Sequence, residues 1–264
     1  MRRKIYVLVV IIVVFLGLTI AGISIKRQTS AQNSLHPNYL LLTAAMNGNT
    51  TVVTQLLNTG VDPNTPPGPN DRGLTAIMFA SWRGHRQIVN LLAQRGANVN
   101  AVSNMQSTAL TLAASGGHLE CVQILLNRGA NPDYRGDNNI TALMMAAKNG
   151  HTNVVRLLAQ HGAGLNYRTP SNHTPLMLSI IAQDLQTFQT LLAANPNLEA
   201  RDNMGQTALI LAAKRGILPI VRELLDTGAN IRARDNRNRT ALSKARALNH
   251  TSVVQLLLAR GAQY

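Results

Sequence analysis

Residues 107–131 read STALTLAASGGHLECVQILLNRGAN, and this stretch decides the fold. It opens with Thr-Ala-Leu, continues as a short apolar helix, turns at Gly-Gly-His, and runs through a second apolar helix to an Arg-Gly-Ala-Asn exit. The opening threonine recurs every 33 residues, at Thr75, Thr108, Thr141, Thr174, Thr207 and Thr240. A fixed period of this size is typical of a stacked repeat protein.

Alignment on the turn glycines predicts seven units in residues 38–264. The first unit, at about 38–64, is followed by a loop with three extra residues and several prolines, which stiffen it. Units two to four are regular. The fifth unit has Gln183 and Asn195 in place of its two glycines, and the seventh has Asn249 at its turn. We therefore expect the fifth unit to be the weakest link of the stack.

Each unit can be explained physically. The threonine is an N-cap that accepts backbone N–H groups at the start of the first helix. Paired alanines such as Ala113 and Ala114 let neighbouring helices approach closely, and Val154, Val155 and Leu158 belong to the buried stripe of a second helix. The exit glycines supply the left-handed residue that ends this helix. One unit cannot bury its own apolar faces, so stability comes from stacking on neighbours.

The pattern Thr-(Pro/Ala)-Leu-x-x-Ala-Ala-x-x-Gly-His-x-x-Val-Val-x-x-Leu-Leu-x-x-Gly-Ala-Asn resembles the ankyrin repeat over nearly all of residues 38–264. The resemblance implies an all-α solenoid of about seven helix-turn-helix repeats with loop or β-hairpin fingers. It also implies protein binding through the loop tips and the concave face of the first helices. The family's histidine after Thr-Pro-Leu is absent, which suggests apolar packing there; its place is taken by Met78, Thr111, Met144, Met177, Ile210 and Ser243.

A separate apolar segment precedes the repeats. Residues 5–25 carry no charge, three basic residues stand before them, and Lys26 and Arg27 follow. As a helix, this run would reach roughly 30 Å, the thickness of the hydrocarbon core of a bilayer. We predict a hydrophobic transmembrane anchor or signal segment at 1–27, a linker at 28–37 and an ankyrin-repeat domain at 38–264.

The flanking charges indicate the orientation of this segment. The excess of positive charge before residues 5–25 favours a cytoplasmic N-terminus, which would place the repeats on the extracytoplasmic side, in the periplasm of a Gram-negative host. A cleaved signal, followed by secretion, is the alternative, although the run is longer than a usual signal core and its cleavage sites are poor.

No residue pattern indicates an enzyme. His85, His118, His151 and His250 occupy one repeated position at the start of the second helix, which favours a capping or turn role. The other histidines share no ligand spacing with one another or with the single cysteine, Cys121, and the eleven acidic residues form no carboxylate pair. Cys121 aligns with Ile and Val in sister units and is interpreted as a small buried hydrophobe. We expect no catalytic residue, metal or cofactor.

The positions that vary between units identify a candidate binding surface. They lie just before the turn glycine and just before each opening threonine. Trp82, the only tryptophan, falls at such a position beside Arg83, and Trp and Arg dominate interface hot spots. The alternative is that Trp82 merely covers the neighbouring helix. The predicted partner-binding residues are Trp82, Arg83, Arg72, Lys148, Asn149, Lys214, Arg215, Arg237 and Arg239.

Positive charge is concentrated towards the C-terminus. The whole chain has a net charge of +14, and residues 201–264 hold 11 Lys and Arg against 4 Asp and Glu. This excess would attract an acidic protein or anionic lipid; the alternative is a solvated loop with no partner. Nucleic acid is not expected, because no aromatic residues are interleaved for base stacking. The sequence thus predicts a non-enzymatic, membrane-tethered scaffold or adaptor for an unknown protein; the alternative is a secreted or translocated effector that acts on a host protein.

Overall fold

The computed structural model describes residues 37–65 and 72–263, and within these ranges the chain is helical with no β-strand. Fourteen α-helices form seven consecutive pairs. The pairs are α2 (Pro37–Asn47) and α3 (Thr50–Asn58), α4 (Ala76–Arg83) and α5 (Arg86–Gln94), α6 (Ala109–Gly116) and α7 (Leu119–Asn127), α8 (Ala142–Lys148) and α9 (Thr152–Gln160), α10 (Pro175–Ala182) and α11 (Leu185–Ala193), α12 (Ala208–Arg215) and α13 (Leu218–Asp226), and α14 (Ala241–Ala247) and α15 (Thr251–Ala259). The expected seven helix-turn-helix units are confirmed.

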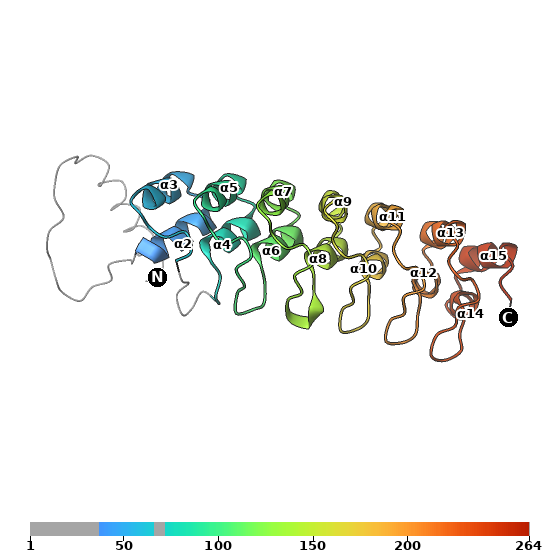
Figure 1. Ribbon diagram of the computed structural model, residues 1–264. Helices are drawn as coiled ribbons and strands as arrows, with labels where there is room; N and C mark the ends of the chain where they lie inside the picture. The colour runs from blue at the N-terminus through green and yellow to red at the C-terminus, as the bar shows by residue number, and fades with distance from the viewer. Residues whose placement is uncertain (1–36, 66–71, 264) are drawn as a thin grey trace, which may run out of the picture. The chain divides into compact units, whose positions relative to one another are not determined.

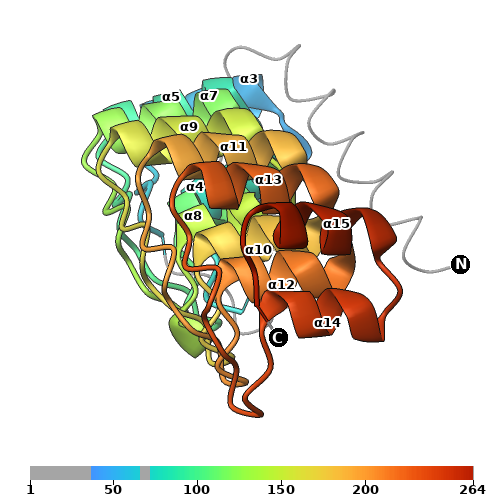
Figure 2. The same cartoon turned by 90° about the vertical axis from the view of Figure 1, so that its right-hand side faces the viewer.

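The helices form two layers (Figure 1). The first helix of each pair packs on the first helix of the next pair in an inner layer, and the second helices form an outer layer above it. The loops between pairs project from one end of the inner helices and form a row of their own, and we call these loops the fingers (Figure 2). Each helix therefore contacts the other helix of its pair and the corresponding helices of the neighbouring pairs, as expected of a solenoid.

Most of the threonines cap the inner helices as predicted. The hydroxyl oxygens of Thr108, Thr141, Thr174, Thr207 and Thr240 each accept the backbone N–H three residues later. Thr75 is the exception, because its side chain makes no capping bond and its oxygen is buried without a hydrogen-bond partner. Unit two therefore begins its inner helix without this source of stability.

The core consists of small residues inside and aliphatic residues between the layers. The paired alanines Ala113 and Ala114 are fully buried, as are Val155 and Leu158 of the outer layer. The residues that replace the family's histidine pack mostly as expected, because Met78, Met144, Met177 and Ile210 are all buried. Thr111 instead closes a capping box with Thr108, and Ser243 is exposed.

The fingers are hydrogen-bonded loops, and the expected β-hairpins do not form strands in the described residues. The five fingers that follow α5, α7, α9, α11 and α13 are each closed by a backbone bond across the turn, in addition to a tighter bond within it. The closing bonds are Ser103 N–H to Ser107 O, Gly136 N–H to Ile140 O, Thr169 N–H to His173 O, Asp202 N–H to Gln206 O and Asp235 N–H to Arg239 O, at 2.9 to 3.1 Å. Neighbouring fingers are joined by isolated bonds, such as that from Asn236 N–H to Met204 O (2.9 Å). Such isolated bonds do not make a continuous ladder.

The predicted anchor and most of the linker lie outside the described residues, as do residues 66–71 and 264. Within residues 37–65 and 72–263, no helix is both long and apolar enough to cross a membrane.

Candidate functional site

The surface formed by the fingers and the exposed last turns of the inner helices is the candidate site, and we call it the inner face. Trp82 lies on it in the last turn of α4, with 45% of its surface exposed. The guanidinium carbon of Arg83 stands 4.6 Å from the centre of the indole ring, a cation–π distance. The ring is thus presented to solvent beside a charge and is not sealed in the core.

The repeated histidines link consecutive units, which differs from the capping role expected for them. They occupy the N-cap position of the outer helices, but none of their side chains caps its own helix. Each Nε2 instead approaches a carbonyl near the end of the previous inner helix: His85 to Met46 (3.2 Å), and His118 to Trp82, His151 to Ser115 and His250 to Lys214 (3.0 Å each). A carbonyl only accepts, so Nε2 carries the proton.

These links hold the backbone of the inner face. The carbonyls of Trp82, Ser115 and Lys214 belong to the variable positions just before the turn glycine. Because the next unit satisfies those carbonyls, the adjacent side chains are displayed from a fixed backbone. The histidine ring needs a glycine beneath it, since a Cβ built on Gly84 would lie 2.5 Å from Nδ1 of His118.

The fifth unit lacks this link on both sides. Asp184 stands at the histidine position and caps its own helix by accepting the N–H of Thr187 (2.8 Å). At the next junction Ile217 replaces the histidine, and Gln183 replaces the glycine while keeping its left-handed conformation (φ 58°). The prediction that unit five is the weakest link therefore has a structural rationale, and it stays a prediction.

A second set of side-chain links fixes the bases of the fingers. The Asn64 carboxamide accepts the N–H of Asn98 (2.7 Å) and donates to Gly96 O (2.9 Å), and Asn100 makes the same pair of contacts one unit later. Later junctions keep only the bond in which the side-chain oxygen accepts: the N–H of Gly164 donates to Asp133, that of Asn197 to Asn166 and that of Asn230 to Glu199. The fingers are thereby aligned with one another along the stack.

The last finger contains a buried ion-pair cluster. The Asp235 carboxylate accepts the backbone N–H groups of Arg237 and Arg239 and pairs with the Arg239 guanidinium (3.0 Å) and the nearly buried Lys244 ammonium (3.1 Å). Burial alone would raise the pKa of Asp235, but these hydrogen bonds outweigh it and hold the pKa well below its usual range. The finger is therefore held to α14 by charge.

His173 lies at the base of the finger between α9 and α10, with Nε2 3.8 Å from the Asp202 carboxylate. Burial lowers the pKa of His173, and the Arg215 charge lowers it further, against the opposing effect of Asp202. The ring is therefore neutral near pH 7 and adds no charge to the inner face.

The structure divides the remaining predicted partner-binding residues into two groups. Arg72, Lys148, Arg215 and Arg237 are exposed, and Lys214 is partly exposed. The other two are engaged within the protein: Asn149 donates to Ser115 O (2.8 Å) and Arg239 pairs with Asp235. Their side chains are accordingly poorer candidates for partner contacts.

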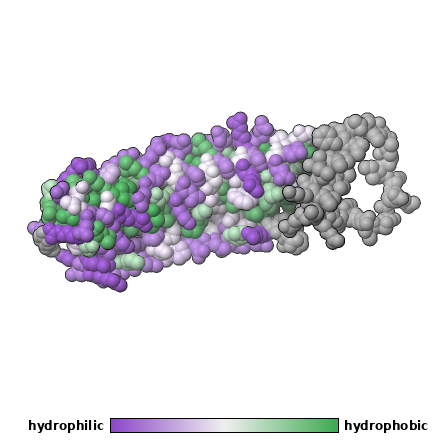
Figure 3. Space-filling model, turned by 180° about the vertical axis from the view of Figure 1, so that it is seen from behind, coloured by the Kyte–Doolittle hydropathy of each residue, from purple (hydrophilic) through white to green (hydrophobic). Residues whose placement is uncertain are grey.

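The sequence reasoning missed a column of arginines. Arg135, Arg168, Arg201 and Arg234 are each exposed and stand at the same position of four consecutive fingers. Their spacing of 33 residues was the available signal. Three apolar residues at the variable positions were not chosen as partner contacts and are exposed: Met105, Met204 and Leu248, at 49 to 57%. Figure 3 shows a largely hydrophilic face with hydrophobic surface gathered most densely toward the C-terminal end, at the left of the view.

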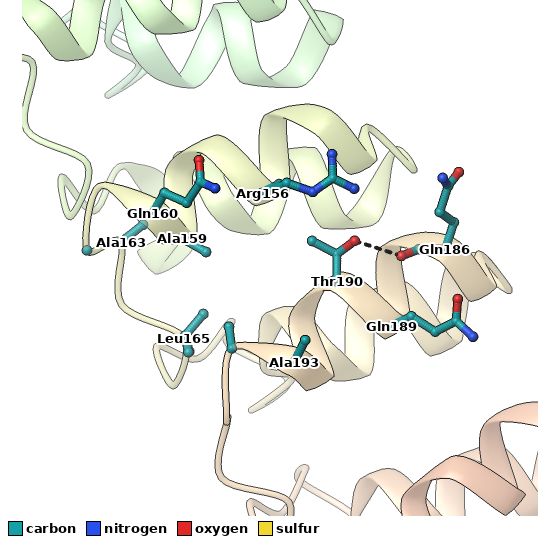
Figure 4. A pocket seen from close by; sticks show the side chains of 11 residues that line it. Arg156, Ala159, Gln160, Ala163, Leu165, Gln186, Gln189, Thr190 and Ala193 are labelled. Carbon is teal, nitrogen blue, oxygen red and sulfur yellow. Dashed lines mark hydrogen bonds between the residues drawn. The ribbon is translucent and has the colours of Figure 1, made fainter.

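Two cavities border the described helices. A small one, of about 380 Å³, lies between the last finger and α14 and is lined by Arg234, Asn238, Arg239, Thr240, Leu242, Ser243 and Arg246. A wide, shallow one of about 860 Å³ opens between α9 and α11 on the outer layer (Figure 4). Its walls are mostly glutamines and alanines, with Arg156 and Leu165 among them, and Thr190 there donates to Gln186 O of its own helix (3.0 Å). Only the small cavity belongs to the inner face.

No described group of three or more His, Cys, Asp or Glu residues is arranged to hold a metal ion. Cys121 is buried, as predicted for a structural hydrophobe. Burial, reinforced by the charge of Glu120, raises the pKa of the Cys121 thiol to about 11, so it carries almost no thiolate at neutral pH.

The helix pairs stack and are linked from unit to unit, and the fingers and helix ends form an open face. This architecture defines a repeat protein with a surface available to another macromolecule. A family model described as ankyrin repeats (3 copies) matches residues 19–103, 41–136, 112–202 and 182–264. The chain belongs to the ankyrin-repeat family, and this membership implies a protein–protein interaction module.

Solved and curated relatives agree with this assignment. The crystal structure of the human ASB11 ankyrin repeat domain superposes with a TM-score of 0.74 at 26% identity, covering 85% of this chain and 98% of that one. Human and mouse apoptosis-stimulating of p53 protein 2 are each 34% identical over 85 residues. That alignment covers 30% of this chain and only 7% of each relative, so this chain corresponds to a small part of those proteins.

Proposed function

We propose that this chain is a non-enzymatic scaffold or adaptor that binds a protein partner through its inner face and finger tips. We further propose that residues 5–25 tether it to a membrane with the repeats on the extracytoplasmic side, which is the periplasm in a Gram-negative host. The first proposal rests on the exposed side chains of the inner face, and the second rests on the apolar run and its flanking charges.

The observation that carries the binding proposal is the exposed Trp82 with Arg83 stacked on its ring. A monomeric surface gains nothing from exposing an indole, whereas an interface buries it with a large gain of apolar area. Met105 and Met204, at the tips of fingers on the same face, add flexible apolar contacts. An exposed indole on a face that also carries adaptable apolar side chains is suited to bind a protein surface.

Site-specific photo-crosslinking from position 82 in the full-length chain, carried out in its native membranes, tests this proposal. The captured protein is then purified and its affinity measured against the unmodified chain. We expect Trp82→Ala to weaken that affinity by roughly tenfold or more, the usual cost at a hot spot. Trp82 is the only tryptophan, so a shift of its fluorescence on binding reports contact at this site directly.

The matched control is Leu258→Ala, which truncates an exposed apolar residue of the outer helix α15. It should leave the affinity unchanged, and a crosslinker at position 258 should not capture the same protein. Equal capture from both positions, or an unchanged affinity of Trp82→Ala, would show that the partner does not bind through the Trp82 region of the inner face.

The tether is tested separately by the mature N-terminus and by extraction. An intact Met1, with the chain retained in carbonate-washed membranes and released when residues 1–27 are deleted, supports an anchor. A mature chain that begins near Gly22 or Gln32 and is found in the soluble fraction supports secretion and contradicts the proposed membrane tether.

A further inference from the structure

The arginine column, defined as Arg135, Arg168, Arg201 and Arg234, runs along the C-terminal fingers. Within residues 37–65 and 72–263, no column member forms an ion pair with a carboxylate. Two exposed carboxylates stand two positions along the chain from a column member: Asp137 from Arg135, and Glu199 from Arg201. Glu199 already accepts the backbone N–H of Asn230 (2.8 Å). Neither carboxylate forms an ion pair with the column, whose positive charges therefore remain available to an acidic ligand.

Side-chain contacts within the protein order three of the four column members, Arg135, Arg201 and Arg234. The Arg201 guanidinium donates to Arg234 O (2.7 Å), so one member reaches across to the next finger. Arg234 donates in turn to Asn238 O (2.9 Å), and the Arg135 guanidinium lies 5.3 Å from the centre of the Tyr167 ring. A guanidinium has five N–H donors, so one such bond leaves most of them for a ligand. Side chains ordered in advance also lose less entropy on binding.

The column ends at the small cavity between the last finger and α14. Arg234, Arg239 and Arg246 all line this space, with Leu242 and Ser243 among the residues around it. Its volume of about 380 Å³ is enough for one side chain but too little for a folded element. Because Arg234 lines this cavity together with residues of the inner helix α14, the column faces the inner face at its C-terminal end.

We propose that the arginine column is the docking track for an extended acidic segment of the partner protein, whose terminal carboxylate enters the small cavity. Packed helices stand about 8–10 Å apart, so successive column members are spaced by roughly that distance. An extended chain advances about 3.3 Å per residue, so one acidic residue in about every three matches the column. The inference rests on the proposed function, because it specifies the chemistry of the partner that the inner face binds.

A row of charges with a regular pitch favours a peptide over a membrane surface. A membrane presents many mobile headgroups with no fixed linear spacing, so neither the pitch of the column nor the side-chain-sized cavity would select for it. Arg–carboxylate pairs, in contrast, form bidentate bonds whose geometry fixes the position of each acid along the chain. Anionic lipid is therefore an alternative outcome of the test.

The test uses two fluorescein-labelled twelve-residue peptides of identical composition, measured by fluorescence anisotropy with the full-length chain in detergent. One peptide is four repeats of Glu-Ser-Gly, and the other has its four glutamates in one block. We expect the spaced peptide to bind roughly tenfold more tightly than the blocked one, because only it places a carboxylate at each charge-assisted contact.

The column variant carries R135Q, R168Q, R201Q and R234Q, and a matched control carries R86Q, R128Q, R156Q and R222Q, four exposed arginines of the outer-layer helices and their ends. Both sets remove the same charge. The column variant should lose roughly tenfold in affinity for the spaced peptide, and the control set less than about threefold, because distant exposed charges are screened. Replacing the four column residues by lysine should restore part of the affinity and separates a loss of charge from a loss of folding.

Equal affinities for the two peptides, or equal losses in the two variant sets, would show only diffuse attraction and overturn the inference. So would tighter binding to phosphatidylserine vesicles than to the spaced peptide, with the same dependence on the column. If the column variant keeps full affinity for a partner that Trp82→Ala loses, the acidic track fails while the proposed function stands. If Trp82→Ala binds that partner with normal affinity and only the column variant loses affinity, the proposed role of Trp82 in binding is wrong instead.

Discussion

The contributions to the free energy of unfolding of a linking histidine ring and of the glycine beneath it should be coupled. His151 donates to Ser115 O (3.0 Å), and its ring lies over Gly117, where a Cβ would come within 2.5 Å of Nδ1. Gly117 also has φ of 73°, a conformation that costs an alanine about 1–2 kcal/mol. We therefore expect the effects of Gly117→Ala and His151→Ala to be strongly non-additive.

The magnitudes follow from the contacts. His151→Ala loses one partly buried hydrogen bond, worth about 1 kcal/mol. Gly117→Ala adds its backbone strain to the loss of the same bond, since the new Cβ displaces the ring, for a total of about 2–3 kcal/mol. In the double variant the bond is lost only once, so its cost should fall short of the sum of the single costs by about 1 kcal/mol.

Urea unfolding followed by circular dichroism at the helix band measures all four proteins, with the slope of the transition checked for each. Stack stability is a sum of unit and interface terms, so the loss should appear as a shift of midpoint and not as a loss of fold. Additive costs within about 0.3 kcal/mol would refute the ring-over-glycine reasoning. The same reasoning applied to unit six predicts that Ile217→His destabilises alone but less so, or not at all, when combined with Gln183→Gly.

Three further outcomes are expected. Thr141→Ala should cost about 1 kcal/mol in urea unfolding, whereas Thr75→Ala should cost clearly less, because Thr75 makes no capping bond; equal costs would contradict the assigned caps. Asp235→Asn should lower stability at neutral pH by about 3 kcal/mol through the loss of its ion pairs, and the deficit should shrink below about pH 4. That sign follows because a depressed folded pKa stabilises above the unfolded pKa and loses its effect as pH falls; a pH-independent deficit would be inconsistent with it. Cys121 should react slowly with a thiol reagent at pH 8 until the chain is unfolded, and rapid labelling of the native protein would contradict its burial.

The repeat and its helix caps were predictable because they depend on local chemistry. The threonine period, the apolar stripes and the turn glycines together predicted seven helix pairs, and the buried positions of Met144 and Cys121 followed from alignment with sister units. The exposure of Trp82 was predictable for the same reason, since its place in the unit is that of a solvent-facing turn. Whether it binds a partner remains a prediction.

The histidine links and the arginine column were not predicted correctly, because they depend on residues of different units. His118 looked like a local cap, yet its ring reaches a carbonyl 36 positions earlier. Arg239 was chosen as a partner contact, yet it is paired with Asp235, while Arg201, which was passed over, is exposed and aligned with its neighbours. Side-chain partners across a stacking interface follow from distances in space, which spacing along the chain does not report.

The 33-residue period alone thus specifies helix pairs that must stack, because no single pair can bury its apolar faces. It also places the variable residues on one side of every unit. Only the folded stack decides which of those side chains remain available and which are bound to the next unit. The reason is that each junction brings together groups more than 30 positions apart, and their pairing depends on how closely two complete units pack.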